Sequence, residues 1–155
     1  MLDALHLKYV EEVGSMNVFF VKDNTLYTSP LTNGTILLGV TRDSTIQLAK
    51  DAGYTVKEEA LAIEDVIAGI HDRSISDVFG ARSAVVIVSV GNFYYKKVFH
   101  EVNNFQTGKI TQKMYDDLTG IQTTCKPDPY GCIFTFFHKI IVYFCLIKTY
   151  HIFVF

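Results

Sequence analysis

Strand-like and helix-like patterns alternate along most of the chain, and this alternation restricts the fold more than any other feature of the sequence. The segments 17–22 and 25–29 are strand-like and flank Asp23 and Asn24, which favour turns, so a hairpin is predicted. Apolar residues at helical spacing predict three helices, at 42–52, 63–70 and 110–121. Strands that alternate with helices in this way are typical of a mixed α/β domain.

Three more segments predict strands. Residues 54–61 alternate between polar and apolar side chains, and residues 83–90 form a continuous apolar run of strand length. Such a run is typical of a central strand that is covered on both faces. Residues 93–102 are predicted to form its more exposed neighbour.

Composition limits the class of the protein. The chain has 155 residues, of which 49% are hydrophobic and 19% charged, as expected for one globular domain. A formal net charge of −2 with scattered lysines and arginines offers no basic surface for nucleic acid. Residues 1–15 lack the basic start and apolar run of a signal peptide, so a cytoplasmic location is expected. Neither the three cysteines nor the five histidines show the spacing of metal ligands: Cys125, Cys132, Cys145, His6, His71, His100, His138 and His151.

The composition changes near Phe134. Residues 135–155 consist mainly of Phe, Ile, Tyr and Val, but charged residues and histidines leave only 140–147 uninterrupted. This is much shorter than the roughly 20 apolar residues that cross a membrane, so a membrane span is not expected. A buried strand pair is one alternative. We favour an apolar tail unrelated to the rest of the chain, of the kind that translation beyond a lost reading frame produces.

Gly39 and Glu12 are the two positions that suggest a ligand. A strand that ends at Leu38 and passes Gly39 would leave the amides of Val40 and Thr41 free at the start of a helix, where anions such as phosphate bind. The alternative is a simple turn. Glu12 precedes an apolar strand and is either a solvated strand entrance or the partner of a protonated ligand group, such as the pyridine nitrogen of pyridoxal phosphate.

Five motifs occur in an order that resembles a known family. They are EEVGSMNVFFV, GTILLGVTRDS, DVFGARSAVVIVSVG, YDDLTGIQ and PDPYGCIF, and together they cover residues 1–134. In this order they resemble the C-terminal domain of branched-chain amino acid aminotransferases, which are fold type IV pyridoxal phosphate enzymes. The resemblance implies an α/β fold in which a mixed sheet forms a pseudo-barrel with flanking helices, and a homodimer is the family's usual assembly.

The resemblance also implies roles for individual residues. Glu12 matches the carboxylate that pairs with the pyridine nitrogen, and Leu37 matches the aliphatic residue that packs on the ring. The amides of Val40 and Thr41 match the phosphate-binding amides. Ser83 matches a threonine whose hydroxyl reaches the phosphate region, and the backbone at Ser83 and Ala84 matches the site of the substrate carboxylate.

The chain departs from the family pattern at several positions. The Schiff-base lysine and the N-terminal domain of the family have no counterpart in these 155 residues, so no catalytic residue is assigned. Arg82 stands where the family has glycine, next to the expected pocket, and is expected either to narrow the pocket or to lie in a surface loop. Leu38 replaces a residue that is usually proline or small, Ser89 replaces a proline, and Cys132 replaces a tryptophan.

Two functions of different classes therefore remain at this stage. The first is a branched-chain aminotransferase that moves an amino group between leucine, isoleucine or valine and 2-oxoglutarate, with this chain inactive on its own. The alternative is a non-catalytic remnant or interaction module that comes from a truncated gene.

Overall fold

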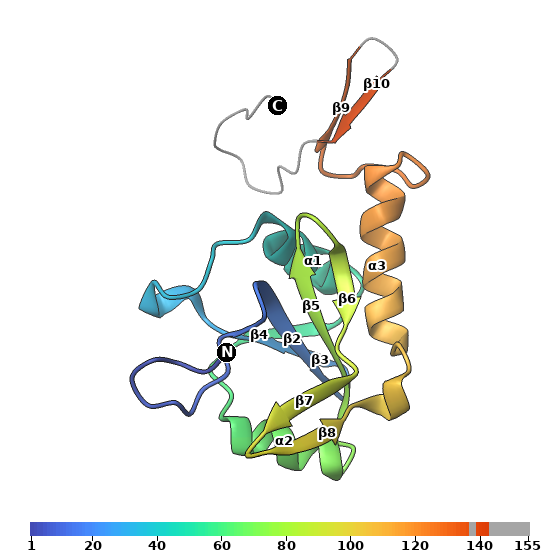
Figure 1. Ribbon diagram of the computed structural model, residues 1–155. Coiled ribbons are helices and arrows are strands. Elements are labelled where there is room, and N and C mark those ends of the chain that lie inside the picture. Colours follow the sequence, from blue (N-terminus) through green and yellow to red (C-terminus); the bar gives the residue numbers. More distant parts are fainter. Residues whose placement is uncertain (137–138, 143–155) are drawn as a thin grey trace.

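The computed structural model describes residues 1–136 and 139–142 (Figure 1). The strands are β1 Glu12–Val13, β2 Met16–Lys22, β3 Thr25–Thr28, β4 Thr55–Glu58, β5 Ile75–Arg82, β6 Val86–Ser89, β7 Asn92–Tyr95, β8 Val98–Glu101, β9 Ile133–Phe136 and β10 Lys139–Val142. The helices are α1 Val40–Asp51, α2 Ile63–His71 and α3 Lys109–Gln122, with short 3-10 turns at Leu31–Asn33 and Asn103–Phe105.

The main sheet has the strand order β4-β3-β2-β5-β6, and β1 pairs with the start of β2. β3 and β4 are parallel, whereas the other neighbours are antiparallel, so the sheet is mixed as predicted. Among the described residues the outer strands β4 and β6 do not pair with each other. The expected pseudo-barrel is therefore an open sheet with no closed hydrogen-bonded ring in this part of the chain.

β2 lies at the centre of the fold and is buried on both faces from Asn17 to Val21. Phe19 and Val21 point into a core formed with α1, α3, β5 and β6, and Phe19 stacks on Phe79 with ring centroids 4.9 Å apart. Val18 and Phe20 point into a second core with α2 and the β7–β8 hairpin. Burial of each such side chain stabilises the fold by about 1.5–3 kcal/mol, so the strand secures two apolar layers at once.

Several predicted elements are confirmed. The β2–β3 hairpin forms around Asp23, which adopts a positive φ of 53°. Each of the three helices begins within two residues of its predicted start. The largest difference is at α1, which begins at Val40 and not at residue 42. Gly53 follows α1 with a φ of 84°, a conformation that glycine adopts without strain.

The region from 75 to 101 differs from the prediction. The central neighbour of β2 is β5, which the sequence patterns missed because Asp77, Gly80 and Arg82 interrupt its apolar run. The predicted central strand 83–90 was wrong, because it begins with a turn and continues as the edge strand β6. The predicted single strand 93–102 is a separate hairpin, β7 and β8, since Lys96 and Lys97 both adopt positive φ at its turn.

The C-terminal region contains the antiparallel pair β9 and β10, which Figure 1 shows beyond the end of α3. A buried strand pair was the alternative interpretation of residues 135–155, and the pair β9–β10 includes residues 135–136 and 139–142 of that range. The remainder of the predicted tail, residues 137–138 and 143–155, lies outside the described residues. In the part of the chain that the structure describes, the helices are all too short or too polar to cross a membrane.

Asp77 joins the sheet to the start of α3. Its carboxylate Oδ2 accepts hydrogen bonds from the hydroxyl of Thr111, at 2.6 Å, and from the amide of the same residue, at 3.2 Å. Thr111 lies in the first turn of α3, where amides have no partner within the helix. Burial raises the pKa of Asp77, and the hydrogen bonds from Thr111 oppose that rise without cancelling it.

This raised pKa predicts a pH dependence of stability. The folded state holds the Asp77 proton more tightly than the unfolded state, so the carboxyl stabilises the fold below its ordinary pKa of 3.8, and this contribution disappears as pH rises through the raised pKa. In urea unfolding, the wild type should therefore lose stability relative to Asp77→Asn as pH rises above the ordinary pKa of 3.8 and through the raised pKa. Thr111→Val, which removes the hydroxyl donor, should enlarge the loss. Parallel pH profiles for all three proteins would contradict the assignment.

Candidate functional site

Glu12 begins the row of residues that organises the candidate site. The register pairs Glu12 with Asn17 on β2, and Asn17 with Ala81 on β5. Directly paired residues in a sheet point to the same face, and two strand spacings separate the ends of this row by about 10 Å. Asn17 alternates with Phe19 and Val21, so this is the face that α1 and α3 cover.

The segment 34–39 is attached to this row at Leu37, which hydrogen-bonds to Glu12 and Asn17. The Leu37 amide donates to Oε1 of Glu12 at 3.3 Å, and the Leu37 carbonyl accepts from Nδ2 of Asn17 at 3.0 Å. The hydroxyl of Thr35 donates to Glu11 at 2.6 Å. The predicted strand that ends at Leu38 was wrong: side chains and not a strand ladder bind this segment, and Leu37 and Leu38 remain 70% and 72% exposed.

Gly39 connects this segment to α1. It is the N-cap residue, its backbone is extended, and no side chain caps the helix. The amides of Val40 and Thr41 therefore lie in the first turn, where the helix supplies no acceptor and the helix dipole favours an anion. Val40 is 43% exposed, whereas Thr41 is almost completely buried.

The absence of a side chain at Gly39 has a specific cause. A Cβ atom at this position would lie 2.2 Å from Oδ1 of Asn17, well inside van der Waals contact. Asn17 uses the same amide group to hold the Leu37 carbonyl. Gly39 thus allows Asn17 to fix the segment in front of the helix.

Arg42 connects the first turn of α1 to the neighbouring strands through hydrogen bonds. The sequence patterns did not suggest this role. Arg42 is 1% exposed, and its guanidinium donates to the Ser29 carbonyl at 2.9 Å and to the Glu58 carboxylate at 2.7 Å. The Ser29 hydroxyl in turn donates to the carbonyl of Val10 at 2.5 Å. Buried donors and acceptors linked in this way connect the start of α1 to the strand entrance that carries Glu12.

Ser83 and Ala84 lie in the exposed turn between β5 and β6. Figure 1 shows this turn at the same end of the molecule as α1. The preceding Arg82 points its guanidinium to the hydroxyl of Ser15, with 2.6 Å between Nη1 and Oγ. Arg82 thereby joins the β5–β6 turn to the β1–β2 turn, which follows Glu12 and Val13.

The arrangement suits an elongated anionic ligand with a basic ring. Glu12 supplies a half-buried carboxylate, Leu37 an exposed aliphatic surface, and Val40 an unpaired amide at a helix N-terminus. The hydrogen bond between the Leu37 amide and Glu12 holds the carboxylate next to the segment that leads into the helix. These are the groups that would hold the ring nitrogen, the ring face and the phosphate of pyridoxal phosphate. The paired row and the hydrogen bond to Leu37 thus bring a carboxylate, an exposed aliphatic side chain and a helix N-terminus into one region of the fold.

Comparison with known proteins gives the family of the chain. The family model described as amino-transferase class IV matches residues 5–93, and the chain belongs to this family. It is 48% identical over 130 residues to a probable branched-chain-amino-acid aminotransferase of Staphylococcus epidermidis, and 43% identical over 130 residues to branched-chain-amino-acid aminotransferase 2 of Bacillus subtilis. In both cases the match covers 84% of this chain and 36% of the relative, so the chain spans about a third of their length.

Solved structures show the same relationship. The branched-chain amino acid aminotransferase of Escherichia coli matches with a TM-score of 0.70 at 30% identity, over 84% of this chain and 39% of that one. The branched-chain aminotransferase of Thermoproteus uzoniensis matches with a TM-score of 0.61 at 29% identity, over 78% and 35% of the two chains. The mixed sheet with its helices is therefore the fold that these enzymes share.

The contact between Gly39 and Asn17 predicts a non-additive pair of substitutions. Gly39→Ala should destabilise the chain by about 1–3 kcal/mol, because the new methyl group displaces the Asn17 amide and leaves its hydrogen bond unmade. In an Asn17→Ala background the same change should cost much less, since the nearest remaining contact of the new Cβ is an ordinary 3.5 Å to Arg42. A double-mutant cycle by urea unfolding measures this coupling. Additive costs would show that the methyl group meets some other obstacle.

Proposed function

We propose that this chain is the cofactor-binding C-terminal part of a branched-chain amino acid aminotransferase. The protein would transfer amino groups between leucine, isoleucine or valine and 2-oxoglutarate with pyridoxal phosphate, in the cytoplasm. One observation carries the proposal: Glu12 is bonded to the segment that leads directly into the free N-terminus of α1. A carboxylate and an anion-binding helix end thus serve a single ligand. The 48% identity to an aminotransferase favours this function over the interaction module.

Each residue of the proposed site has a separate task. The Glu12 carboxylate holds a proton on the pyridine nitrogen, and that proton makes the bound cofactor the electron sink of the reaction. Leu37 packs against the ring face and excludes water from it. The amides of Val40 and Thr41 bind the phosphate. The hydroxyl of Ser83 assists at the phosphate, and the backbone at Ser83 and Ala84 binds the substrate carboxylate.

The hydrogen bonds that Arg42 makes to Ser29 and Glu58 fix the position of the proposed site residues at the start of α1. The Arg42 guanidinium donates to Ser29 and Glu58, so the proposal does not use its charge to bind the phosphate. Arg82 is the cation nearest to the proposed carboxylate site in sequence, and its bond to Ser15 keeps it in the adjacent turn. We assign the phosphate to neutral amides, and therefore expect pyridoxal phosphate to bind this chain weakly.

The first test asks what this chain does alone. No residue of the proposed site is a lysine, so the 155-residue chain should bind pyridoxal phosphate reversibly and show no transamination of leucine with 2-oxoglutarate above background. After borohydride reduction, mass spectrometry should find no single lysine that carries a stoichiometric pyridoxyl group. A fully labelled lysine together with turnover would show that a lysine of this chain performs the covalent step.

The second test removes one phosphate donor without a change to the helix. Val40 is the first residue of α1 and follows an extended Gly39, which is the position at which helices accept proline. Val40→Pro should weaken pyridoxal phosphate binding about tenfold, as expected for one lost hydrogen bond to a charged group. The measurement is a fluorescence titration of the chain with the cofactor.

Two controls make this result specific. Val40→Ala removes the same side chain but keeps the amide, so it should bind pyridoxal phosphate like the wild type. Pyridoxal, which has no phosphate, should bind Val40→Pro and the wild type equally. Equal loss in the alanine variant, or equal loss for pyridoxal, would locate the phosphate elsewhere.

A further inference from the structure

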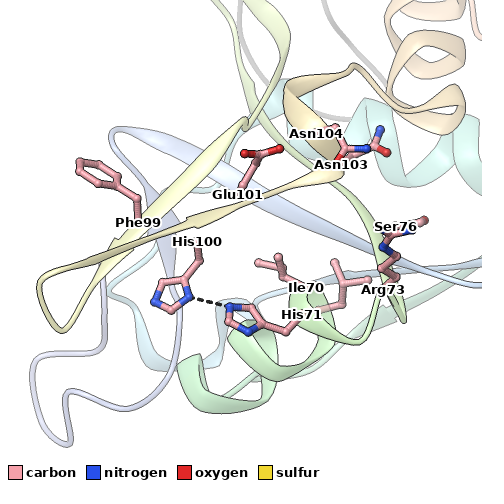
Figure 2. Close-up of a pocket in the computed structure, with 10 residues that line it drawn as sticks. Ile70, His71, Arg73, Ser76, Phe99, His100, Glu101, Asn103 and Asn104 are labelled. Atoms are coloured by element: carbon pink, nitrogen blue, oxygen red, sulfur yellow. Dashed lines mark hydrogen bonds between the residues drawn. The ribbon is translucent and has the colours of Figure 1, made fainter.

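Two histidines meet at the side of the molecule that carries α2 and the β7–β8 hairpin. His71 is the last residue of α2 and His100 lies in β8, and Figure 2 shows their rings facing each other. Nε2 of His71 and Nδ1 of His100 are 2.9 Å apart. They stand at the edge of a pocket of about 480 Å³ that also includes Arg73, Ser76 and Glu101.

The two rings are brought together by buried neighbours. Ile70, beside His71, and Val102, two residues after His100, belong to the same apolar core and are 7% and 2% exposed. The hairpin partner of His100 is Phe93, which packs against that core as well. Both backbone segments are therefore fixed by packing, and the imidazoles converge without depending on each other for their position.

We propose that His71 and His100 together bind one divalent transition-metal ion, with Cu²⁺ as the preferred metal. Imidazole nitrogens bind such ions at about 2.0–2.1 Å. Two ligands at this distance and at a right angle lie about 2.9 Å apart, whereas a tetrahedral angle would separate them by about 3.3–3.4 Å. The 2.9 Å between the nitrogens suits adjacent positions of a tetragonal site, the geometry that Cu²⁺ and Ni²⁺ favour.

Metal binding would replace the hydrogen bond between the rings. In that bond one of the facing nitrogens carries a proton. The proton can move to the outer nitrogen of the same ring, so that both facing nitrogens present lone pairs and no proton needs to leave the protein. Small ring rotations then direct both lone pairs to the ion, which the exposure of His71 permits.

The other charged groups of the pocket define what surrounds the ion. Glu101 follows His100 in β8, and Figure 2 shows its carboxylate pointing away from the imidazole pair. Among residues 1–136 and 139–142 no group of three or more His, Cys, Asp or Glu side chains could hold a metal. The protein would thus contribute two ligands and water the rest. The two histidines lie on α2 and β8, which carry none of the proposed cofactor-binding residues.

The test is a titration of the full chain with CuCl₂. Isothermal calorimetry measures the affinity, and electron paramagnetic resonance identifies the ligands of the bound ion. The wild type should bind one ion tightly, with hyperfine splitting from two equatorial nitrogens. His71→Gln and His100→Gln should each weaken this site about a hundredfold, since a second ligand on the same scaffold raises affinity by a factor of this order. His6→Gln, and His138→Gln combined with His151→Gln, should leave it unchanged.

A second experiment uses only the wild type, so its outcome does not depend on whether the glutamine variants fold. On addition of ZnCl₂ to the wild type, nuclear magnetic resonance should show shifts of the His71 and His100 imidazole signals with a common dissociation constant. Loss of affinity in only one of the two glutamine variants, retention of the site in both, or shifts confined to other histidines would overturn the proposal.

Discussion

Burial of β2 on both faces is the constraint on which the rest of the structure depends. Five consecutive residues, Asn17 to Val21, are buried, and β2 pairs with β3 and β1 along one edge and with β5 along the other. Alternate side chains must therefore enter two different cores, and each core needs its own cover. α1 and α3 cover one face, while α2 and the β7–β8 hairpin cover the other.

The candidate site follows from the end of this same strand. Asn17 is the first buried residue of β2, and it lies opposite Glu12 while its side chain holds the carbonyl of Leu37. The close approach of Gly39 to Asn17 then sets where α1 can begin. Arg42 secures the other side of that first turn through Ser29 and Glu58. The strand side of the candidate site is thus an extension of the core, and the exposed segment 34–39 is attached to it through Asn17 and Glu12.

The histidine pair shows a limit of local sequence patterns. Metal sites are usually recognised from ligands a few residues apart, and by that criterion His71 and His100 are unrelated. They are 29 residues apart and belong to different elements, which only the second core brings together. The same reason hid Arg42, whose partners Ser29 and Glu58 are 13 and 16 residues away.

The sequence by itself determined the helices, the first hairpin, the mixed α/β class and, through five ordered motifs, the family. Helical periodicity and turn residues are local signals, so the structure of segments such as 63–70 and 23–24 can be predicted without knowledge of what they pack against. Strand order is not local. Whether a strand is central or at an edge depends on partners far along the chain, and for this reason β5 was missed and β6 was misplaced. The family resemblance grouped Glu12, Leu37 and the start of α1, but only the tertiary structure supplied the hydrogen bond that links the first two, because it joins segments 25 residues apart.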